Sequence, residues 1–376
     1  MMGKSEYALR GGVDYKSLEP FKMAMMDVGR RTLRLPEARD VSIVTSVLHS
    51  HGGVYEYTGT RRHRWSKTLE GLGNKNWIAE WMHQFDGTGN SHYYGIGIDA
   101  AMMAVNDCIA QGALPVTYAD EVAAGDSDWF RDESRASDLG EGFYEACRMS
   151  KMALVAGESP ALKYLVNARA PVASAPSLSG CVVGIIAPAN RLIDGVKLRS
   201  GDRIIGIPSS GLHANGVSLV ISRAMELKDQ FLTRLPNGNS LGDEALIPTL
   251  CYVDFVEGLL DAGVDIHALL PGTGSGVAKV AFDHRPHTYR IHSWPKVPPI
   301  FQFMQELGVS DRDCVTTFNF GVGYYVFVPP HEVDRTLEIA WATGHPDALE
   351  VGVVEDGERQ TIFGPFDDMV LPPPGE

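Results

Sequence analysis

Three glycine-rich loops carry side chains that suit phosphate binding: Glu70 to Lys75, Ser209 to Gly216, and Pro271 to Gly276. Glycine lets backbone N–H groups approach phosphate oxygens closely, and a helix that follows such a loop adds positive potential. Because the chain has 40 glycines, tight turns are the alternative explanation for each loop. None of the loops has the spacing of a P-loop or of a dinucleotide-binding motif, so the sequence supports neither.

Asp107 is an acidic residue on an otherwise apolar segment. The spacing of apolar residues predicts a helix from about Asp99 to Gln111. At a rise of 1.5 Å per residue, Asp99 and Asp107 lie about 12 Å apart along its axis. One magnesium ion, with ligands at about 2.1 Å, cannot bind both directly. We interpret Asp99 as the helix cap, whereas a metal ion or a cation is the usual reason for an acid such as Asp107.

Glu158 is a second acidic candidate. It follows the apolar run Met152 to Val155 and a glycine, Gly157. A carboxylate at the end of a buried element can point into a cleft, and an exposed acid in a turn is the alternative interpretation.

The elements that must position these residues alternate between strands and helices. We expect extended segments at 116–118, 181–186, 203–208, 324–328 and 349–354. We expect helices through the 140s to about 157, and at 217–227, 248–261 and 331–343. The turn-rich stretch 188–203 marks a boundary between domains 1–190 and 191–376. Strands and helices mixed in two blocks favour an α/β fold of α+β sandwiches over a bundle or an all-β domain.

Composition excludes several classes of partner. The 376 residues are 44% hydrophobic and 21% charged, which suits a globular protein with two domains. With 33 basic and 47 acidic residues the net charge is -14, whereas nucleic acid and anionic membranes both require a basic face. We find no apolar segment of signal-peptide or membrane-span length, and the five scattered cysteines suggest neither disulfides nor zinc. We expect a cytoplasmic protein.

The residues of these motifs and their order along the chain resemble those of the aminoimidazole ribonucleotide (AIR) synthetase family. The most specific stretches are Gly95-Ile96-Gly97-Ile98-Asp99, Met103-Ala104-Val105-Asn106-Asp107 with Gln111-Gly112-Ala113, and Pro208-Ser209-Ser210-Gly211-Leu212-His213-Ala214-Asn215-Gly216-Val217-Ser218-Leu219. Supporting pieces are Gly12-Val13-Asp14, Gly157-Glu158, Pro248-Thr249, Tyr252-Val253, Phe318-Asn319 and Gly321-Val322-Gly323. Together they span nearly the whole chain.

The resemblance implies a two-domain AIR synthetase-like fold and a homodimer. The N-terminal sheets of two subunits would form a dimer-spanning barrel, and the C-terminal domain would be a mixed sheet flanked by helices. It also implies ATP, Mg²⁺ and the substrate formylglycinamidine ribonucleotide. ATP would phosphorylate the formyl oxygen, an amidine nitrogen would attack the activated carbon, and phosphate would leave as the imidazole ring of purine biosynthesis closes. Positioning and charge neutralisation would supply most of the rate.

The same resemblance assigns the site residues. It makes Asp107, Glu158, His213 and Asn215 the catalytic candidates. It makes Glu70, Gly71, Gly73, Lys75, Ser209, Ser210 and Gly274 the candidates for binding ATP or phosphate, and Asp107 with Glu70 the metal ligands.

The sequence departs from the family pattern at five positions. At Pro271 the family has a histidine that would contact the reacting groups, and His267, four residues earlier, cannot be assumed to replace it. The other departures are Glu70 for Asp, Asn74 for Thr, and Ala161 and Ser177 where acids are expected.

Two other functions stay open. One is a catalytically degenerate relative that binds nucleotide as a regulatory or assembly subunit, which Pro271 and Ser177 favour and which Lys75, Asp107 and Glu158 oppose. The other is a different ATP-dependent member of the superfamily. Selenophosphate synthetase and the hydrogenase-maturation dehydratase would each require a terminal cysteine that is absent here, and thiamine-phosphate kinase would require more N-terminal aspartates.

Overall fold

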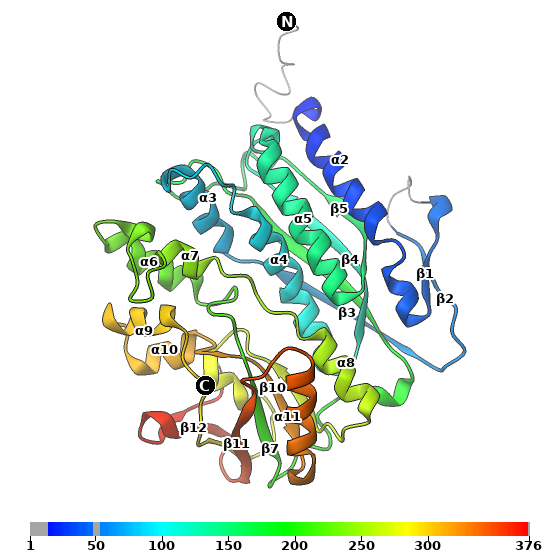
Figure 1. The fold of residues 1–376 in the computed structure, drawn as a ribbon, viewed down its shortest axis with the longest axis vertical. Coiled ribbons are helices and arrows are strands. Elements are labelled where there is room, and N and C mark those ends of the chain that lie inside the picture. The colour runs from blue at the N-terminus through cyan, green and yellow to red at the C-terminus, as the bar shows by residue number, and fades with distance from the viewer. Residues whose placement is uncertain (1–13, 48–52, 375–376) are drawn as a thin grey trace, which may run out of the picture. The chain divides into compact units, whose positions relative to one another are not determined.

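The computed structural model describes residues 14–47 and 53–374, so the motif residues Gly12 and Val13 lie outside the described part. Figure 1 shows the fold coloured from blue at the N-terminus to red at the C-terminus. The chain divides into two compact units. The first contains Leu114–Pro188 and the chain up to Cys108, and the second contains Ile109–Ala113 and the chain from Ala189 onward.

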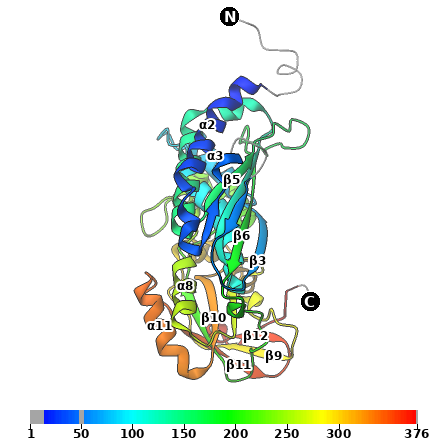
Figure 2. The same cartoon turned by 90° about the vertical axis from the view of Figure 1, so that its right-hand side faces the viewer.

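The first unit is a sheet with helices on one face, as Figure 2 shows from the side. The strands of its larger sheet lie in the order β3-β6-β4-β5; β4 and β5 run parallel, and the other neighbours run antiparallel. Strands β1 and β2 form a separate antiparallel pair. The bounds are α2 Tyr15–Thr32, β1 Val41–Ile43, β2 Tyr55–Tyr57, β3 Arg64–Gly71, α3 Lys75–Phe85, α4 Tyr93–Cys108, β4 Leu114–Ala123, α5 Glu133–Ser150, β5 Ala153–Glu158 and β6 Ser177–Ile186.

Strand β3 shows how alternation assigns the two faces of this sheet. Ser66 and Thr68 face Cys108 of α4. Trp65 and Leu69 point the other way and remain 42% and 68% exposed. Because successive side chains of a strand point to opposite faces, one face of β3 is covered by helix and the other exposes large apolar groups.

Helix α4 begins at Tyr93, earlier than the sequence indicated, and the prediction that Asp99 caps it was wrong. Gly97, which precedes the predicted helix in the sequence, lies inside the observed one. A Cβ atom there would lie 2.6 Å from the backbone oxygen of Leu139 in α5, so this glycine allows the two helices to pack closely. The predicted end is confirmed, because α4 continues only as a 3-10 turn before Gly112, whose φ is 77°.

The helix expected through the 140s ends at Ser150, not near 157. Lys151 then adopts the left-handed conformation, and the run from Ala153 to Glu158 is strand β5, paired in parallel with β4. The apolar residues of this run fit either structure by pattern alone, and pairing with β4 decides between them. The segment expected at 116–118 is the centre of a longer strand, β4.

The second unit is built on a mixed seven-stranded sheet, which agrees with the expected C-terminal domain. Its order is β13-β12-β9-β11-β7-β10-β8, with β12 and β9 parallel and the other neighbours antiparallel. The bounds are β7 Arg203–Pro208, α6 Val217–Glu226, α7 Leu241–Ala245, α8 Val253–Ala262, β8 Ala268–Pro271, β9 His287–Ile291, α9 Pro299–Glu306, α10 Asp311–Thr317, β10 Val322–Val328, α11 Val333–Ala342, β11 Leu349–Asp356, β12 Gln360–Phe363 and β13 Met369–Leu371.

Most expected elements of this unit are confirmed, but helix α8 begins at Val253 instead of Pro248. Polar contacts hold residues 248–252 outside the helix. The Ser210 hydroxyl donates to the backbone oxygen of Pro248 at 2.6 Å, and the Tyr252 hydroxyl donates to that of Pro208 at 3.0 Å. These bonds tie the segment to the loop that follows β7.

The expected absence of disulfides is confirmed, because all five cysteines are free. Burial raises the pKa of the Cys108 thiol to about 12, so this group is an inert part of the core. Within residues 14–47 and 53–374, we find no helix with the length and apolar character needed to cross a membrane.

Candidate active site

The first glycine-rich loop connects β3 to α3. Glu70 and Gly71 end the strand, and Lys75 is the first residue of the helix. Gly73 has a φ of 73°, in the left-handed region that favours glycine. The arrangement is thus a strand, a short glycine-containing turn and a helix N-terminus, which is a geometry that suits phosphate.

Lys75 is completely buried and paired with Asp99. Its Nζ lies 2.8 Å from Asp99 Oδ2, and both side chains are 0% exposed. Burial lowers the pKa of Lys75, and the neighbouring carboxylate opposes that shift. The lysine expected to line the phosphates therefore forms the buried link between the start of α3 and the middle of α4.

A second buried carboxylate, Glu80, holds α3 in place. It accepts hydrogen bonds from the Tyr93 hydroxyl at 2.7 Å, from Trp129 Nε1 at 2.7 Å and from Arg135 Nη2 at 2.8 Å. These donors come from the start of α4, from the 3-10 turn Ser127–Arg131 and from α5. Glu80 thus fixes the helix that begins at Lys75 against its neighbours.

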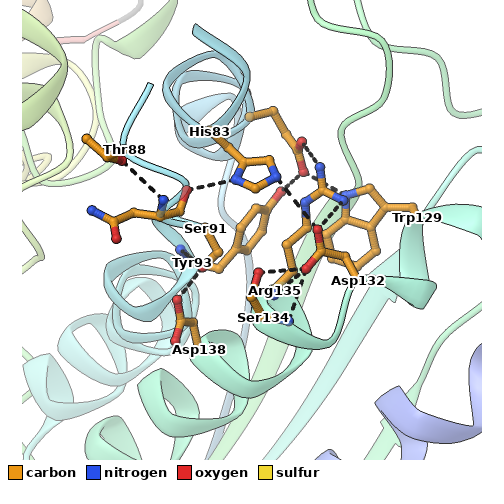
Figure 3. A network of polar contacts seen from close by, with 11 residues as sticks. His83, Thr88, Ser91, Tyr93, Trp129, Asp132, Ser134, Arg135 and Asp138 are labelled. Atoms are coloured by element: carbon orange, nitrogen blue, oxygen red, sulfur yellow. Dashed lines mark hydrogen bonds and ion pairs between the residues drawn. The ribbon is translucent and has the colours of Figure 1, made fainter. Parts of the chain in front are cut away.

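The surrounding contacts in Figure 3 fix the ends of the same helices. His83 Nδ1 donates to the backbone oxygen of Asn90 at 2.7 Å, and Asp132 caps α5 by accepting the Ser134 N–H at 3.0 Å. The Ser91 hydroxyl accepts the Tyr93 N–H at 3.1 Å where α4 begins. Spacing along the chain gives no signal for this network, because its members are brought together only by the packing of α3, α4 and α5.

Asp107 lies in the last turn of α4 and is partly exposed. Eight residues of helix separate it from Asp99, which corresponds to about 12 Å along the axis. The structure therefore does not bring Asp107 to the Lys75–Asp99 pair, and Asp107 has access to solvent that the pair lacks.

Glu158 lies at the opposite edge of the sheet from Glu70. Its strand β5 is separated from β3 by β4 and β6, and three strand spacings of about 4.8 Å amount to about 14 Å. Within the part of the chain that the structure describes, no three His, Cys, Asp or Glu side chains form a group able to hold a metal ion. A magnesium ion at Asp107 or Glu70 would complete its shell with phosphate oxygens and water, as this ion commonly does.

The second loop, after β7, is organised by Asn319. The Ser209 hydroxyl donates to Asn319 Oδ1 at 2.9 Å, and Asn319 Nδ2 donates to the backbone oxygen of Gly211 at 2.9 Å. Ser210 is bound to Pro248 by its side chain, as described above. In the sequence, Asn319 is only part of a supporting motif. In the structure, its hydrogen bonds determine the shape of the loop.

His213 is 1% exposed and has a left-handed φ of 54°. Its Nε2 accepts the backbone N–H of Ser210 at 3.3 Å, so the proton of the neutral ring is on Nδ1. Gly323 must be a glycine, because a Cβ atom there would lie 2.7 Å from His213 Cε1 and 2.0 Å from the Tyr252 hydroxyl. His213 is therefore held as a hydrogen-bond donor through Nδ1.

Asn215 and the third loop both leave polar groups available to a ligand. No acceptor within the described ranges reaches the buried Nδ2 of Asn215. In the third loop, Gly274, Ser275 and Gly276 have successive φ values of 71°, 59° and 56°. Lys279 adds a positive charge there by donating to the Thr273 backbone oxygen at 2.5 Å. Successive N–H groups in such a turn form a concavity that suits anions.

His267 does not replace the histidine that is missing at Pro271. Its ring is 3% exposed, with Nδ1 2.7 Å from Asp202 Oδ2 and Nε2 3.2 Å from Asp265 Oδ2. Both ring nitrogens are therefore engaged by carboxylates. Pro271 itself is buried at the end of β8, opposite Tyr324 of β10.

The candidate residues are divided between the two units, and within the first unit Asp107 and Glu158 lie apart from the loop that holds Glu70 and Lys75. The first unit holds Glu70, Gly71, Gly73, Lys75, Asp107 and Glu158, and the second holds Ser209, Ser210, His213, Asn215 and Gly274. Sequence reasoning missed Glu80 and the buried Asp120 of β4, and it identified Asn319 only as part of a supporting motif. An acid inside the apolar β4 segment was the available signal for Asp120.

Comparison with known proteins identifies the class to which this arrangement belongs. Residues 70–186 match the family of AIR synthase related protein, N-terminal domain, and residues 199–364 match the corresponding C-terminal domain family. Among solved structures, hydrogenase maturation protein HypE in complex with ATP is similar, with a TM-score of 0.60, 16% identity, and 92% of each chain covered. Thiamine-monophosphate kinase from Stenotrophomonas maltophilia is also similar, with a TM-score of 0.57, 17% identity, and 89% of this chain and 94% of that one covered. The fold is therefore that of a two-domain AIR synthase related protein.

Relatives that are similar in sequence identify one family within this class. Phosphoribosylformylglycinamidine cyclo-ligase of Methanothermobacter thermautotrophicus is 32% identical over 77% of this chain and 79% of the relative. That of Lactobacillus acidophilus is 32% identical over 86% of this chain and 91% of the relative. The chain belongs to the phosphoribosylformylglycinamidine cyclo-ligase family of enzymes.

Proposed function

We propose that this enzyme closes the imidazole ring of 5-aminoimidazole ribonucleotide from formylglycinamidine ribonucleotide, with ATP and Mg²⁺. The observation that carries the proposal is identity above 30% to named cyclo-ligases over most of both chains. In the reaction, the formyl oxygen attacks the γ-phosphorus of ATP and ADP leaves. The amidine nitrogen then bonds to the formyl carbon and loses a proton, and phosphate leaves with the carbon–oxygen electron pair.

The geometry of the two groups of residues supports roles in that reaction. The turn at Gly71 and Gly73 and the turn at Gly274 offer backbone N–H groups to phosphate oxygens. His213, as a donor through Nδ1, and the unpaired Nδ2 of Asn215 suit oxygen atoms of the substrate. Mg²⁺ at Asp107 and Glu70 would neutralise triphosphate charge, which is its usual contribution to phosphoryl transfer.

A steady-state assay tests the proposal. With formylglycinamidine ribonucleotide, ATP and Mg²⁺, we expect ADP and the aminoimidazole product to appear in equal amounts. ATP binding without turnover would instead support a degenerate relative, and ATP hydrolysis only with another acceptor would support a different enzyme of the superfamily. Pro271 is the observation that favours the degenerate relative, because His267 is held by two carboxylates and does not replace the missing histidine.

The exposed face of β3 supports a homodimer formed through the first unit. β3 is an edge strand of its sheet, and its exposed Trp65 contacts the rings of Tyr55 and His63 at centroid distances of 5.6 and 5.5 Å. Large apolar groups of this kind, exposed together, are typical of protein interfaces. A second copy of the chain is the occupant that the family resemblance implies.

Leu69→Glu is expected to convert this dimer to a monomer. The substitution would replace an exposed apolar group of this face with a charge, which would lose its water on burial against a second copy. Light scattering after size-exclusion chromatography would report the mass. Trp341→Glu is the matched control, because Trp341 is a 72% exposed apolar side chain of the second unit. Dimers that persist in Leu69→Glu would contradict the assignment of the interface to β3.

A further inference from the structure

Asp120 is a buried carboxylic acid that the candidate site does not yet explain. It lies in β4, between β6 and β5, and is 6% exposed. Among residues 14–47 and 53–374, no donor forms a hydrogen bond to its Oδ1. Buried polar groups are almost always hydrogen-bonded, so an unpaired carboxyl oxygen requires an explanation.

Two glycines of the neighbouring strands leave room here, Gly157 for the carboxyl group of Asp120 and Gly180 for the ring of Tyr118. Gly157 of β5 and Gly180 of β6 are its register partners on either side. A Cβ atom at Gly157 would lie 2.6 Å from Asp120 Oδ1, and one at Gly180 would lie 2.0 Å from the hydroxyl of Tyr118. Tyr118 is two residues away on the same face of β4, fully buried, and its hydroxyl also lacks a hydrogen bond within the described chain.

Four titratable groups lie around Asp120, and each is an acid or a weak acid: Glu158, Cys147, Tyr118 and Cys181. Glu158 directly follows Gly157 in β5, and Cys147 comes from α5. Tyr118 lies on β4 itself, with Cys181 of β6 beside it. Burial, and then repulsion from Glu158, raise the pKa of Asp120 to about 7. At neutral pH, Asp120 is thus near the midpoint of its own titration and carries only part of a negative charge.

We propose that Asp120 is a positioning residue of the ring-closure site: as a neutral acid it keeps a second negative charge away from Glu158, and its ionisation weakens the binding of the anionic substrates. This inference rests on the proposed function, because it places Glu158 in the substrate cleft. Asp120 need not touch the substrates, since charge acts at a distance through the interior. ATP and the ribonucleotide both carry phosphate, so an added negative charge opposes both.

The first test compares substrate binding by wild-type protein and Asp120→Asn between pH 6 and 8.5, using calorimetry with ATP and Mg²⁺ in the absence of the ribonucleotide. We expect the wild-type Kd to rise with pH by roughly threefold to tenfold more than that of the variant, which cannot ionise. Only the difference between the two proteins in the pH dependence of Kd tests the inference, because the ligand phosphates themselves titrate near pH 6. The corresponding enzyme kinetics should show the change in KM, with little change in kcat.

Glu121→Gln is the matched control. Glu121 is the next residue of β4, exposed, and its Oε2 accepts a bond from Ser179 at 3.1 Å. The substitution leaves Asp120 intact, so the Kd of this variant should follow the wild-type pH dependence. If Asp120→Asn does not fold, Asp120→Ser serves as the neutral variant.

Thermal unfolding gives a readout that is independent of the ligands. The pKa of Asp120 is higher in the folded chain than in the unfolded one, so its contribution to stability is present below pH 4 and is lost as pH rises through 7. The Tm of Asp120→Asn should therefore rise relative to wild type between pH 4 and 8. If Tm varies with pH in the same way for wild type and Asp120→Asn, the inference is overturned. It is also overturned if the Tm curves differ but the pH dependence of Kd does not. If neither protein binds ATP but the Tm curves diverge, it is the proposed function that fails, and the role in the site fails with it.

Discussion

Lys75→Met is expected to destabilise the first unit by about 3–5 kcal/mol, because it leaves Asp99 as an unpaired charge in the core. Both side chains are fully buried, and their ammonium–carboxylate distance is 2.8 Å. Removing one partner of a buried pair costs far more than the pair contributes, since the remaining charge has lost both water and counter-ion. For a unit of this size the shift in Tm should be on the order of 10 °C.

The double variant Lys75→Met/Asp99→Leu separates the structural role of Lys75 from its proposed role at the phosphates. Replacing both charges with apolar groups should restore most of the stability, because neither ion then remains buried alone. If Lys75 also binds phosphate, the restored protein should still bind ATP poorly in calorimetry. Lys67→Met is the control, because Lys67 is an exposed lysine of β3 and loses the same charge. Wild-type ATP affinity in the double variant would show that Lys75 is structural alone.

The sequence predicts the fold well where local pattern and pairing agree. Strand β6, the β7–α6 loop and the succession β10, α11, β11 follow from apolar runs and turn residues, and the structure reproduces them. The predictions fail where tertiary contacts decide. The helix was expected to begin only after Gly97, but α5 packs against this glycine inside α4. Residues 248–252 were expected to be helical, but hydrogen bonds of Ser210 and Tyr252 hold them outside α8.

The same distinction applies to the candidate site. Gly73 and Gly274 are recognisable from sequence because a left-handed φ requires a particular residue type. Asp99 was misinterpreted because its partner Lys75 is 24 residues away in the chain, and Glu80 was missed because three separate elements supply its donors. Residue type can therefore indicate where the backbone bends, but the partners of a buried charge depend on the packing of elements that are distant in sequence.

Asp107→Ala is expected to reduce turnover by roughly two to three orders of magnitude, the size of effect seen when one group that stabilises developing charge is removed. Its effect on stability should be within about 0.5 kcal/mol, because Asp107 is partly exposed near the end of α4, unlike the buried Asp99. The measurements are kcat/KM in the cyclo-ligase assay at several Mg²⁺ concentrations, together with Tm. Asp27→Ala removes an exposed aspartate from α2 and is the control for loss of charge on a helix. A large fall in Tm would show that Asp107 supports the fold, and an unchanged kcat/KM would remove it from the site. Higher Mg²⁺ should partly restore activity if the carboxylate acts through the metal, because added ion offsets weakened binding by mass action.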